Sequence, residues 1–245
     1  MAVQPWRKGI VVKIEEETYN TRRFWIQVPE LESFDFKPGQ FVTLDLPIHE
    51  KPNKRWRSYS IASWPDGGNV FELLIVLLES GLGTTYFFNE VNVGTELTLR
   101  GPLGSFTLPE TIETDLYFIC TGTGIAPFRS MLNHIKRHNI PHKDIYLVFG
   151  TRSKKDLLYF EELTALQSEI MDFRFLPTLS REKWEGCCGY VHEVYENNVR
   201  EKMNGEELPA AQFYLCGWKM MVDEARKRIA ELGYDRKAVH LELYG

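Results

Sequence analysis

The chain has 245 residues, a formal net charge of −5, and 43% hydrophobic and 26% charged residues. This length allows two ordinary domains, and the composition is typical of a globular protein with a substantial core. The acidic balance argues against nucleic-acid binding, which usually needs a basic excess. The sequence has no apolar run of membrane-spanning length, and residues 1–9 lack the apolar core of a signal peptide, so we expect a cytoplasmic protein.

The cysteines and histidines show no metal-site pattern. The four cysteines include no Cys-x-x-Cys pair and match no zinc spacing. His134, His138 and His142 are spaced by four residues, as metal ligands on one face of a helix would be. Pro141 interrupts any helix that would carry all three. We therefore expect free thiols, no metal ion and no iron–sulfur cluster on this chain.

The first half of the chain, residues 1–110, is predicted to form short strands separated by turns. The β-rich runs are residues 9–14, 23–28, 41–44, 57–63, 70–78 and 97–99. Six short strands at regular spacing indicate a small antiparallel barrel. We expect this barrel to be a domain of its own.

One of these strands, residues 57–63, combines a cation, an aromatic ring and three hydroxyls in the sequence R-S-Y-S-I-A-S. Arg57 offers a planar fork that suits a phosphate, and Tyr59 offers a flat face for a flat ring. Ser60 is a short donor that can reach a ring nitrogen. A flavin dinucleotide needs all three. An ordinary half-buried strand with a surface arginine would have the same sequence. The choice between the two interpretations therefore depends on the other motifs.

A glycine-rich turn, G-L-G-T-T at residues 81–85, follows the buried strand and is predicted to open a short helix over residues 85–91. The start of a helix presents backbone N–H groups and the positive end of a dipole, which suit a phosphate. An ordinary strand-to-helix turn with a threonine cap, without any ligand, would explain the same sequence. Together with Arg57, the turn indicates two phosphate-binding elements on one barrel.

The second half, residues 111–245, alternates strands with helices, which predicts a doubly wound parallel sheet. Strands are expected at residues 116–120, 145–149, 173–176, 212–217 and 239–243, and helices at 128–135, 159–168 and 220–232. Ligands of such sheets bind beyond the carboxyl ends of the strands. The loops 121–127, 151–155 and 216–219 meet there. In the first loop, Pro127 stands where a G-x-G-x-x-G motif has its third glycine.

The motifs together resemble those of the ferredoxin–NADP reductase family over almost the whole chain. They are R-S-Y-S-I-A-S, G-L-G-T-T-Y, T-G-T-G-I-A-P-F-R-S-M-L, Y-L-C-G-W-K-M-M and the ending L-E-L-Y-G. The resemblance implies FAD on the barrel domain 1–110 and NAD(P)H on the α/β domain 111–245. It also implies that the nicotinamide passes a hydride to flavin N5, after which the flavin releases electrons one at a time.

The resemblance assigns roles by position. Ser60 lies beside flavin N5, Cys216 and Glu242 flank the nicotinamide, and Tyr244 covers the flavin face opposite Tyr59. A buried strand-end thiol and an exposed carboxylate are the plain alternatives for Cys216 and Glu242. The full cofactor-binding set comprises Arg57, Ser58, Tyr59, Ser60, Val76, Leu78, Gly83, Thr84, Thr85, Thr123, Gly124, Arg152, Ser180, Arg181, Tyr190, Cys216 and Tyr244.

The choice between NADPH and NADH stays open in the sequence. Ser180-Arg181-Glu182 resembles the family's 2′-phosphate motif, and Arg152 stands where some bacterial members place a further phosphate contact. An arginine pair suits a dianionic phosphate, so we favour NADPH. In contrast, W-E-G-C-C-G-Y at residues 184–190 resembles the W-x-G-x-x-G-Y of NADH-using oxygenase reductases.

The leading hypothesis is a monomeric reductase that passes electrons between NAD(P)H and a separate ferredoxin-like or flavodoxin-like carrier, including one that serves an oxygenase. A free-flavin reductase is one alternative, although Arg57, Thr84 and the Glu-x-Tyr ending favour a retained FAD. An electron-transfer subunit of a larger complex is another. The basic residues between Lys51 and Arg57 fit either an acidic carrier or a solvated loop.

Overall fold

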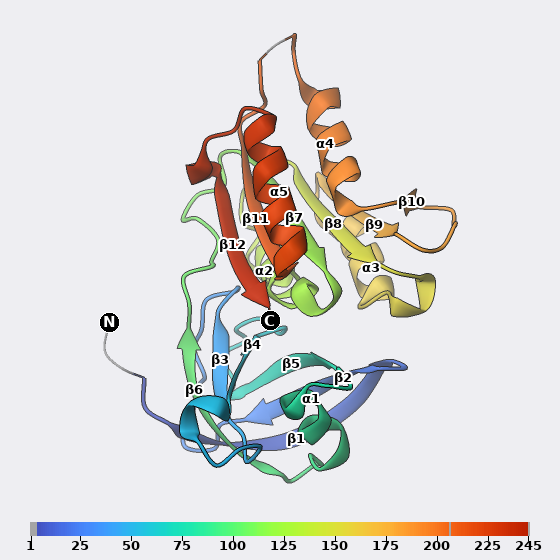
Figure 1. Ribbon diagram of the computed structural model, residues 1–245. Helices are drawn as coiled ribbons and strands as arrows, with labels where there is room; N and C mark the ends of the chain where they lie inside the picture. The colour runs from blue at the N-terminus through green and yellow to red at the C-terminus, as the bar shows by residue number, and fades with distance from the viewer. Residues whose placement is uncertain (1–3, 206, 245) are drawn as a thin grey trace. The chain divides into compact units, whose positions relative to one another are not determined.

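The computed structural model describes residues 4–205 and 207–244, and the chain divides into two compact units (Figure 1). Unit 1 contains the residues up to Thr107 together with Arg129–His134 of a later helix. Unit 2 contains Leu108–Phe128 and the residues from Ile135 onward.

Unit 1 is built on one six-stranded sheet with the order β4-β3-β6-β1-β2-β5, in which neighbouring strands are antiparallel. A bridge between Ile61 and Leu73 brings the chain after β4 to β5, so the sheet curls toward closure. Its elements are β1 (Arg7–Thr18), β2 (Thr21–Gln27), β3 (Phe41–Asp45), η1 (Pro52–Lys54), β4 (Trp56–Ser60), β5 (Val70–Val76), α1 (Leu82–Asn89) and β6 (Glu96–Leu103). The six-stranded antiparallel barrel expected from the sequence is confirmed.

Helix α1 packs on this barrel through Phe87, whose ring lies 4.9 Å from that of Phe24 on β2. The helix begins at Leu82, three residues before the start predicted from the sequence. The prediction placed the whole of Gly81–Thr84 in the turn. In the structure only Gly81 keeps an extended conformation, as the N-cap, and Gly83 is already helical. The glycines therefore lie at the start of the helix and not ahead of it.

Unit 2 has a parallel six-stranded sheet with the order β10-β9-β8-β7-β11-β12. Its elements are β7 (Asp115–Thr121), η2 (Gly122–Ile125), α2 (Ala126–His138), β8 (Ile145–Thr151), η3 (Lys154–Asp156), α3 (Phe160–Glu169), β9 (Phe173–Leu179), β10 (Cys187–Cys188), α4 (Val191–Lys202), β11 (Ala211–Trp218), α5 (Lys219–Glu231), η4 (Arg236–Ala238) and β12 (Val239–Tyr244). The parallel α/β fold expected from the sequence is confirmed.

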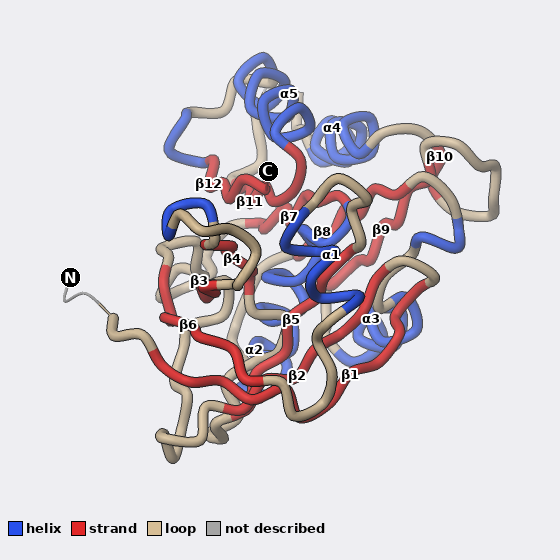
Figure 2. The backbone as a smooth tube through the Cα atoms, turned by 60° about the horizontal axis from the view of Figure 1, so that its bottom comes forward, coloured by secondary structure: helices blue, strands red, loops and turns tan. Residues whose placement is uncertain are grey.

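Helices cover both faces of this sheet, as Figures 1 and 2 show. On one face, Phe118 of β7 stacks on Phe128 of α2 with ring centroids 4.8 Å apart. On the other face, Tyr117 of β7 packs with residues of α4 and α5 in a buried cluster. The central strands β7, β8 and β11 are buried along almost their whole length, which is what a parallel sheet between two helical layers requires.

Helix α4 was not predicted from the sequence. Its buried apolar residues Val191, Tyr195 and Val199 are spaced by four residues and form only a narrow stripe. His192 and Glu196 are buried beside them, so the hydrophobic pattern is diluted by polar residues. The described helices include none that is both long and apolar enough to cross a membrane. Within the described residues, side chains form no metal-binding cluster.

A charged cluster ties the amino ends of β7 and β8 to the end of α4. Lys202 donates to Asp115 and, at 2.6 Å, to Asp144, which also accepts from the Tyr146 hydroxyl at 2.9 Å. Burial alone would raise the pKa of the Asp144 carboxyl, but the bonds from Lys202 and Tyr146 outweigh it and lower that pKa. The depressed pKa means that the ionised form of Asp144 stabilises the fold.

We predict that Asp144→Asn lowers the free energy of unfolding by about 1 kcal/mol at pH 7, the range of a charge-assisted hydrogen bond that is partly exposed. Because the folded pKa is below the unfolded value of about 3.9, this contribution is complete above that value and is lost as the pH falls through the folded pKa. Urea unfolding at pH 7 and near pH 3 measures it. Asp172→Asn, at an exposed turn, is the control. A difference that does not shrink at low pH would contradict the assignment.

Candidate functional site

The carboxyl ends of the strands in unit 2 bring Cys216 between two specific neighbours. In the sheet register Cys216 of β11 pairs with Cys120 of β7 on one side and with Glu242 of β12 on the other. Cys216 is fully buried, and Glu242 is half-buried. The two residues that the sequence analysis placed around the nicotinamide are therefore adjacent in the structure.

The electrostatic surroundings of Cys216 keep its thiol neutral. Burial raises its pKa well above the ordinary value, the Glu242 carboxylate raises it further, and a hydrogen bond with Tyr244 acts in the opposite direction. Burial likewise raises the pKa of Cys120. A thiol that stays protonated at neutral pH is a poor nucleophile, because the thiolate is the reactive form. The arrangement fits a residue that contacts and orients a ring, without a covalent step.

The loop after β7 lies flat against the end of β11. A Cβ at Gly124 would come within 3.0 Å of three backbone atoms of Cys216 and Gly217, so only glycine fits there without a shift. Gly122 has a positive φ of 53°, and a Cβ there would meet nothing within 4 Å. The backbone at Gly122 is thus open to a ligand, while Gly124 provides close packing behind it. Thr123 lies half-buried between them.

Two residues of this edge, Thr121 and Gly217, lie in the loops that the sequence analysis placed at the ligand-binding edge but were not among its predicted site residues. The Thr121 Oγ1 is buried and has no hydrogen-bond partner within the described part of the chain. A Cβ at Gly217 would lie 2.5 Å from that oxygen, so the two residues are in close contact. The signal was present in the sequence, since Thr121 directly precedes Gly122 and Gly217 follows Cys216 in the quoted motifs.

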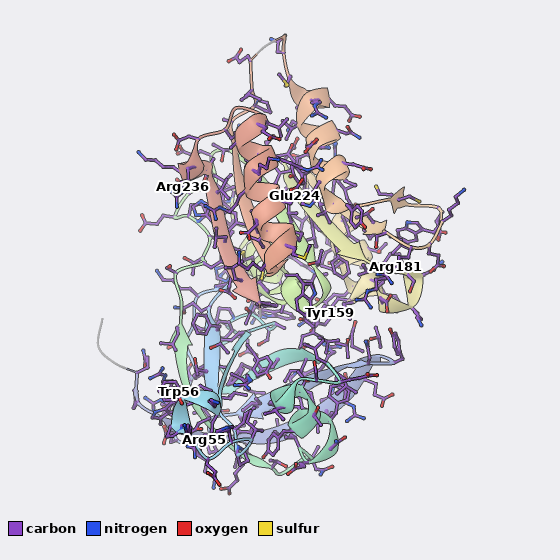
Figure 3. The ribbon with its side chains drawn as sticks, in the orientation of Figure 1. Arg55, Trp56, Tyr159, Arg181, Glu224 and Arg236 are labelled. Atoms are coloured by element: carbon purple, nitrogen blue, oxygen red, sulfur yellow. The ribbon has the colours of Figure 1, made fainter. Side chains whose placement is uncertain are left out.

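The structure also brings together the residues predicted to recognise a 2′-phosphate. The N–H of Ser180 donates to the Thr151 carbonyl at 3.0 Å, and the N–H of Arg181 donates to the Arg152 carbonyl at 2.9 Å. Both arginine side chains are exposed, and Figure 3 shows Arg181 on the loop after β9. The end of β8 and the loop after β9 therefore place two guanidinium groups on adjacent segments.

The acidic residues of the same loop are already engaged. Glu182 accepts the backbone N–H of Lys154 at 2.9 Å, and Glu185 pairs with the Lys154 ammonium at 3.1 Å. Further along, the Trp184 indole donates to the Cys187 carbonyl at 2.7 Å, which shapes the W-E-G-C-C-G-Y segment. Tyr190 at its end is 68% exposed, so its ring is available to a ligand.

In unit 1, Arg57 lies across the first turn of α1. Its Nη1 donates to the carbonyls of Lys54 and Trp56 at 3.1 and 2.8 Å, which fixes the guanidinium. A Cβ at Gly83 would lie 3.0 Å from the Arg57 side chain, so the absence of a side chain at Gly83 permits this approach. The guanidinium and the N–H groups at the start of a helix form a cradle that suits a pyrophosphate.

Tyr59 follows two residues later on the same strand, and its ring meets Phe87 edge-on at a centroid distance of 5.7 Å. Burial raises the pKa of its phenol to about 12, although the charge of Arg57 acts in the opposite direction. Ser58 is exposed and bonds Thr43 at 3.0 Å, whereas Ser60 is buried.

The turn before α1 is closed by Thr84. Its hydroxyl accepts the N–H of Leu78 at 3.1 Å and lies within donor distance of the Leu78 and Gly81 carbonyls, at 3.1 and 3.0 Å. Thr84 is the third residue of α1, where the backbone N–H has no partner inside the helix. The main-chain N–H of Thr84 therefore lies at the start of the helix, a position that suits an anion. Val76 and Thr85 are half-buried at the two ends of the turn.

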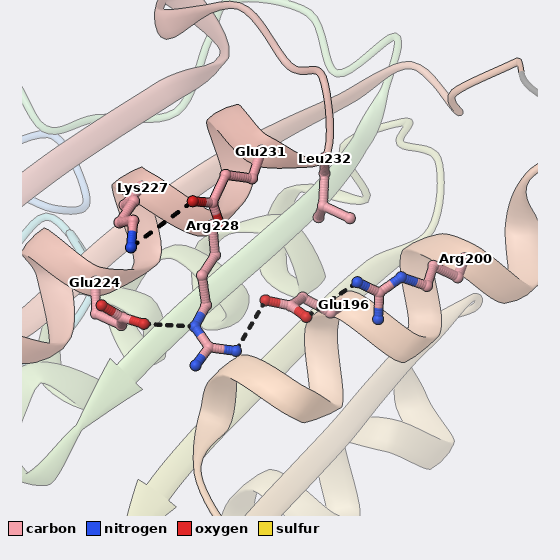
Figure 4. A pocket seen from close by; sticks show the side chains of 7 residues that line it. All are labelled: Glu196, Arg200, Glu224, Lys227, Arg228, Glu231 and Leu232. Carbon is pink, nitrogen blue, oxygen red and sulfur yellow. Dashed lines mark hydrogen bonds and ion pairs between the residues drawn. The ribbon is translucent and has the colours of Figure 1, made fainter.

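Two surface pockets are lined by other residues. One, of about 260 Å³, is lined by residues of α4 and α5, and its charges pair with one another (Figure 4). Arg228 bridges Glu224 at 2.7 Å and Glu196 at 3.2 Å. The other, also about 260 Å³, is lined by Asp45, Arg55 and neighbouring residues of unit 1. Neither lining contains a predicted site residue.

Comparisons with known proteins agree with this division of the site. Residues 8–108 match the family model described as oxidoreductase FAD-binding domain, and residues 118–227 match that described as oxidoreductase NAD-binding domain. The chain is thus an oxidoreductase with an FAD-binding and an NAD(P)-binding domain. The fixed guanidinium of Arg57 beside Gly83 and the open backbone at Gly122 fit these two cofactors.

Similar proteins show which class of oxidoreductase the chain belongs to. The chain is 37% identical over 216 residues to "Ferredoxin--NADP reductase B" of Sorangium cellulosum, covering 87% of each protein. It is 33% identical over 204 residues to "Anthranilate 1,2-dioxygenase electron transfer component" of Acinetobacter baylyi, which covers 82% of this chain but only 56% of that protein. The chain belongs to the ferredoxin–NADP reductase family.

Solved structures show the same fold. The crystal structure of a ferredoxin NADP+ reductase from Neisseria gonorrhoeae with bound FAD and NADP aligns with a TM-score of 0.80 at 27% identity, covering 97% of this chain and 98% of that one. The Amycolatopsis cytochrome P450 reductase GcoB aligns with a TM-score of 0.85 at 26% identity, covering 99% of this chain and 71% of that one. Both domains of the present chain are included in these alignments.

We predict that Gly124→Ala weakens NAD(P)H binding and lowers the free energy of unfolding by about 1–3 kcal/mol, because the added methyl group would overlap backbone that cannot move as a side chain does. Gly122→Asn is the matched control for stability, since asparagine tolerates a positive φ and the position is open. Thermal unfolding and coenzyme titration measure the two effects. Equal stability losses in both variants would contradict the packing role of Gly124.

Proposed function

We propose that the chain is an NAD(P)H-dependent FAD flavoprotein reductase that moves electrons between NAD(P)H and a separate ferredoxin-like or flavodoxin-like carrier. The observation that carries this proposal is the relative named ferredoxin–NADP reductase, which matches 87% of the chain and is itself matched over 87% of its length. In the proposal, residues 1–110 bind FAD and residues 111–245 bind the coenzyme. A monomeric state and a location in the cytoplasm complete it and rest on the sequence alone.

The proposed roles follow the geometry within each unit. Arg57 and the N–H groups of Gly83 and Thr84 hold the FAD pyrophosphate, while Tyr59 presents its ring to the isoalloxazine. Ser60 lies on the same strand and is proposed to sit beside N5. Ser58, Val76, Leu78 and Thr85 complete the proposed FAD-binding residues.

On the coenzyme side, Gly122, Thr123 and Gly124 let the pyrophosphate of the dinucleotide approach the start of η2 and α2. Cys216 contacts the nicotinamide as a neutral thiol, and Glu242 places a carboxylate beside it. Tyr244 would stack on the flavin and give way to the nicotinamide, and Tyr190 is a further proposed cofactor-binding residue. When bound, the flavin accepts a hydride from the nicotinamide and passes electrons on singly.

The protein's task in this reaction is orientation. The donor carbon and the acceptor nitrogen must be held about 3–3.5 Å apart, because only near-attack geometry lowers the barrier. In the proposal, Cys216 and Glu242 would orient the nicotinamide and Ser60 would orient the flavin, by contact and hydrogen bonding with no covalent step. Burial removes water from around Cys216, which strengthens the electrostatic influence of Glu242 on its thiol.

An oxygenase-linked carrier is a second candidate acceptor. It is favoured by the relatives named as electron transfer or reductase components of oxygenases. The acceptor is tested by mixing the FAD-loaded protein with NADPH or NADH under anaerobic conditions and then with a ferredoxin, a flavodoxin or free flavin. Bleaching of the flavin followed by reduction of a carrier supports the proposal. Turnover with free flavin alone, or a chain that does not retain FAD, would refute it.

We predict that Arg57→Ala weakens FAD binding by about 1.5–3 kcal/mol, the usual worth of a hydrogen bond to a charged group. Titration of the FAD-free protein with FAD, followed by flavin fluorescence, gives the dissociation constant. Arg55→Ala is the matched control, because Arg55 lies on the same segment but pairs with Asp45. FAD binding that is weakened equally in both variants would show that the loss comes from general charge and not from the cradle.

We predict that Arg181→Ala raises the KM for NADPH at least tenfold and leaves the KM for NADH within twofold, because only NADPH carries the 2′-phosphate. Lys183→Ala removes an exposed cation from the same loop and is the control. Steady-state kinetics with both coenzymes provide the measurement. Equal effects on the two coenzymes would show that the paired segments at Arg152 and Arg181 do not read the phosphate.

A further inference from the structure

Unit 1 contains a buried carboxylate that is shared by two arginines. Glu72 of β5 is 2% exposed, and Arg129 of α2 is 4% exposed. Arg129 donates to Glu72 Oε2 at 2.9 Å. Arg23 of β2 binds the same carboxylate in a bidentate manner, at 2.7 Å to Oε1 and 3.2 Å to Oε2. Neither arginine is used in the site described above.

Charge neutralisation alone does not explain the second arginine. Arg23 already contacts both oxygens of Glu72, so the carboxylate has a complete partner without Arg129. Burying a further guanidinium is expensive, and a buried ion pair is weak evidence for stability by itself. We therefore looked to the other contacts of Arg129 for the reason that it is buried beside Glu72.

Arg129 also bonds the backbone of Ala62, which follows the strand that carries Tyr59 and Ser60. Arg129 Nη1 donates to the Ala62 carbonyl at 3.0 Å, and its guanidinium lies 5.4 Å from the ring centre of Trp64. The N–H of Ala62 donates to the Glu72 carbonyl at 2.8 Å, and the Ser63 hydroxyl accepts the N–H of Glu72 at 2.9 Å. Arg129 thus closes a network around Ala62 and Ser63, directly after Ser60 and Ile61.

The place of Arg129 in the chain adds a second argument. It is the fourth residue of α2, which continues without interruption from η2, and η2 contains Thr123 and Gly124. The side chain of Arg129 bonds the carbonyl of Ala62, two residues after the strand that carries Tyr59 and Ser60. A guanidinium can donate to a carbonyl and a carboxylate at once, which a shorter or neutral side chain cannot do equally well.

We propose that Arg129 is a positioning residue for hydride transfer: it holds the Ala62 carbonyl and thereby sets the backbone that places Ser60 at the flavin. The inference rests on the proposed function, since it takes residues 57–63 as the flavin strand. Arg129 does not touch the reacting atoms. Its effect is on alignment, so it acts on the rate of flavin reduction more than on coenzyme affinity.

The test compares Arg129→Gln and Arg129→Lys with the matched control Arg23→Gln. Both glutamine variants remove one arginine from Glu72, but only Arg129→Gln also removes the bond to Ala62. Hydrogen exchange of the Ala62 amide reports on the backbone, and visible circular dichroism of the FAD-loaded protein reports on the flavin's surroundings. Stopped-flow reduction gives the rate constant at saturating NAD(P)H and the coenzyme dissociation constant.

For Arg129→Gln we expect at least tenfold faster exchange at Ala62, a changed flavin dichroism and a reduction rate at least tenfold lower. The coenzyme dissociation constant should change less than threefold. Arg129→Lys should recover part of each loss, because its ammonium reaches one of the two acceptors, and Arg23→Gln should stay within twofold of the unmodified protein.

Equal changes in Arg129→Gln and Arg23→Gln would overturn the proposal and leave Arg129 as a simple partner of Glu72. Unchanged exchange and reduction in Arg129→Gln would overturn it as well. If Arg129→Gln does not fold, the comparison of Arg129→Lys with Arg23→Gln decides by the same criteria. Hydrogen exchange requires no flavin, so a chain that fails to bind FAD would refute the proposed function while the anchoring of Ala62 is still measured.

Discussion

The register of the parallel sheet is the constraint on which the coenzyme side of the structure depends. Parallel strands end at the same edge, and hydrogen bonding between β7, β11 and β12 sets Cys216 between Cys120 and Glu242. A shift of β12 by one residue would turn Glu242 to the opposite face, because side chains alternate along a strand. The site therefore needs no special loop conformation to bring these residues together.

A second constraint is the close approach of a glycine backbone to a neighbouring residue, both at the ends of these strands and on the barrel. Gly124 lies against the carbonyl of Cys216, and Gly83 lies against the side chain of Arg57. In both places the missing side chain lets a binding element come close to its neighbour. The backbone N–H groups so exposed are fixed before any ligand arrives, which reduces the entropy lost on binding.

Two clusters of charged residues in the protein differ in what they do. Lys202 with Asp115 and Asp144 joins the amino ends of strands far along the sheet from Cys216, and its role is to stabilise the fold. Glu72 with Arg23 and Arg129 is more deeply buried, and Arg129 also contacts the backbone at Ala62, just after β4. In both clusters each charge has a partner of opposite sign. The two clusters differ because only Arg129, in the Glu72 cluster, also bonds the backbone at Ala62.

The sequence by itself determined the order of the elements, the two kinds of sheet and the motif residues. Alternating and continuous hydrophobic runs differ visibly, and glycine-rich turns have few alternative conformations. It missed α4, because Val191, Tyr195 and Val199 form a stripe too narrow to stand out among polar neighbours. It also placed the start of α1 three residues late, since glycine is a poor helix former and its helical state is imposed by packing.

Only the tertiary structure decided which residues meet. Cys216 and Glu242 are 26 residues apart in the sequence, and their adjacency comes from strand pairing. The joining of Ser180 and Arg181 to Thr151 and Arg152 comes from hydrogen bonds between segments that no local pattern encodes. Arg129 reads from the sequence as one polar residue in a helix. Its burial against Glu72 and Ala62 depends on contacts more than 50 residues distant, and such contacts are fixed by the fold as a whole.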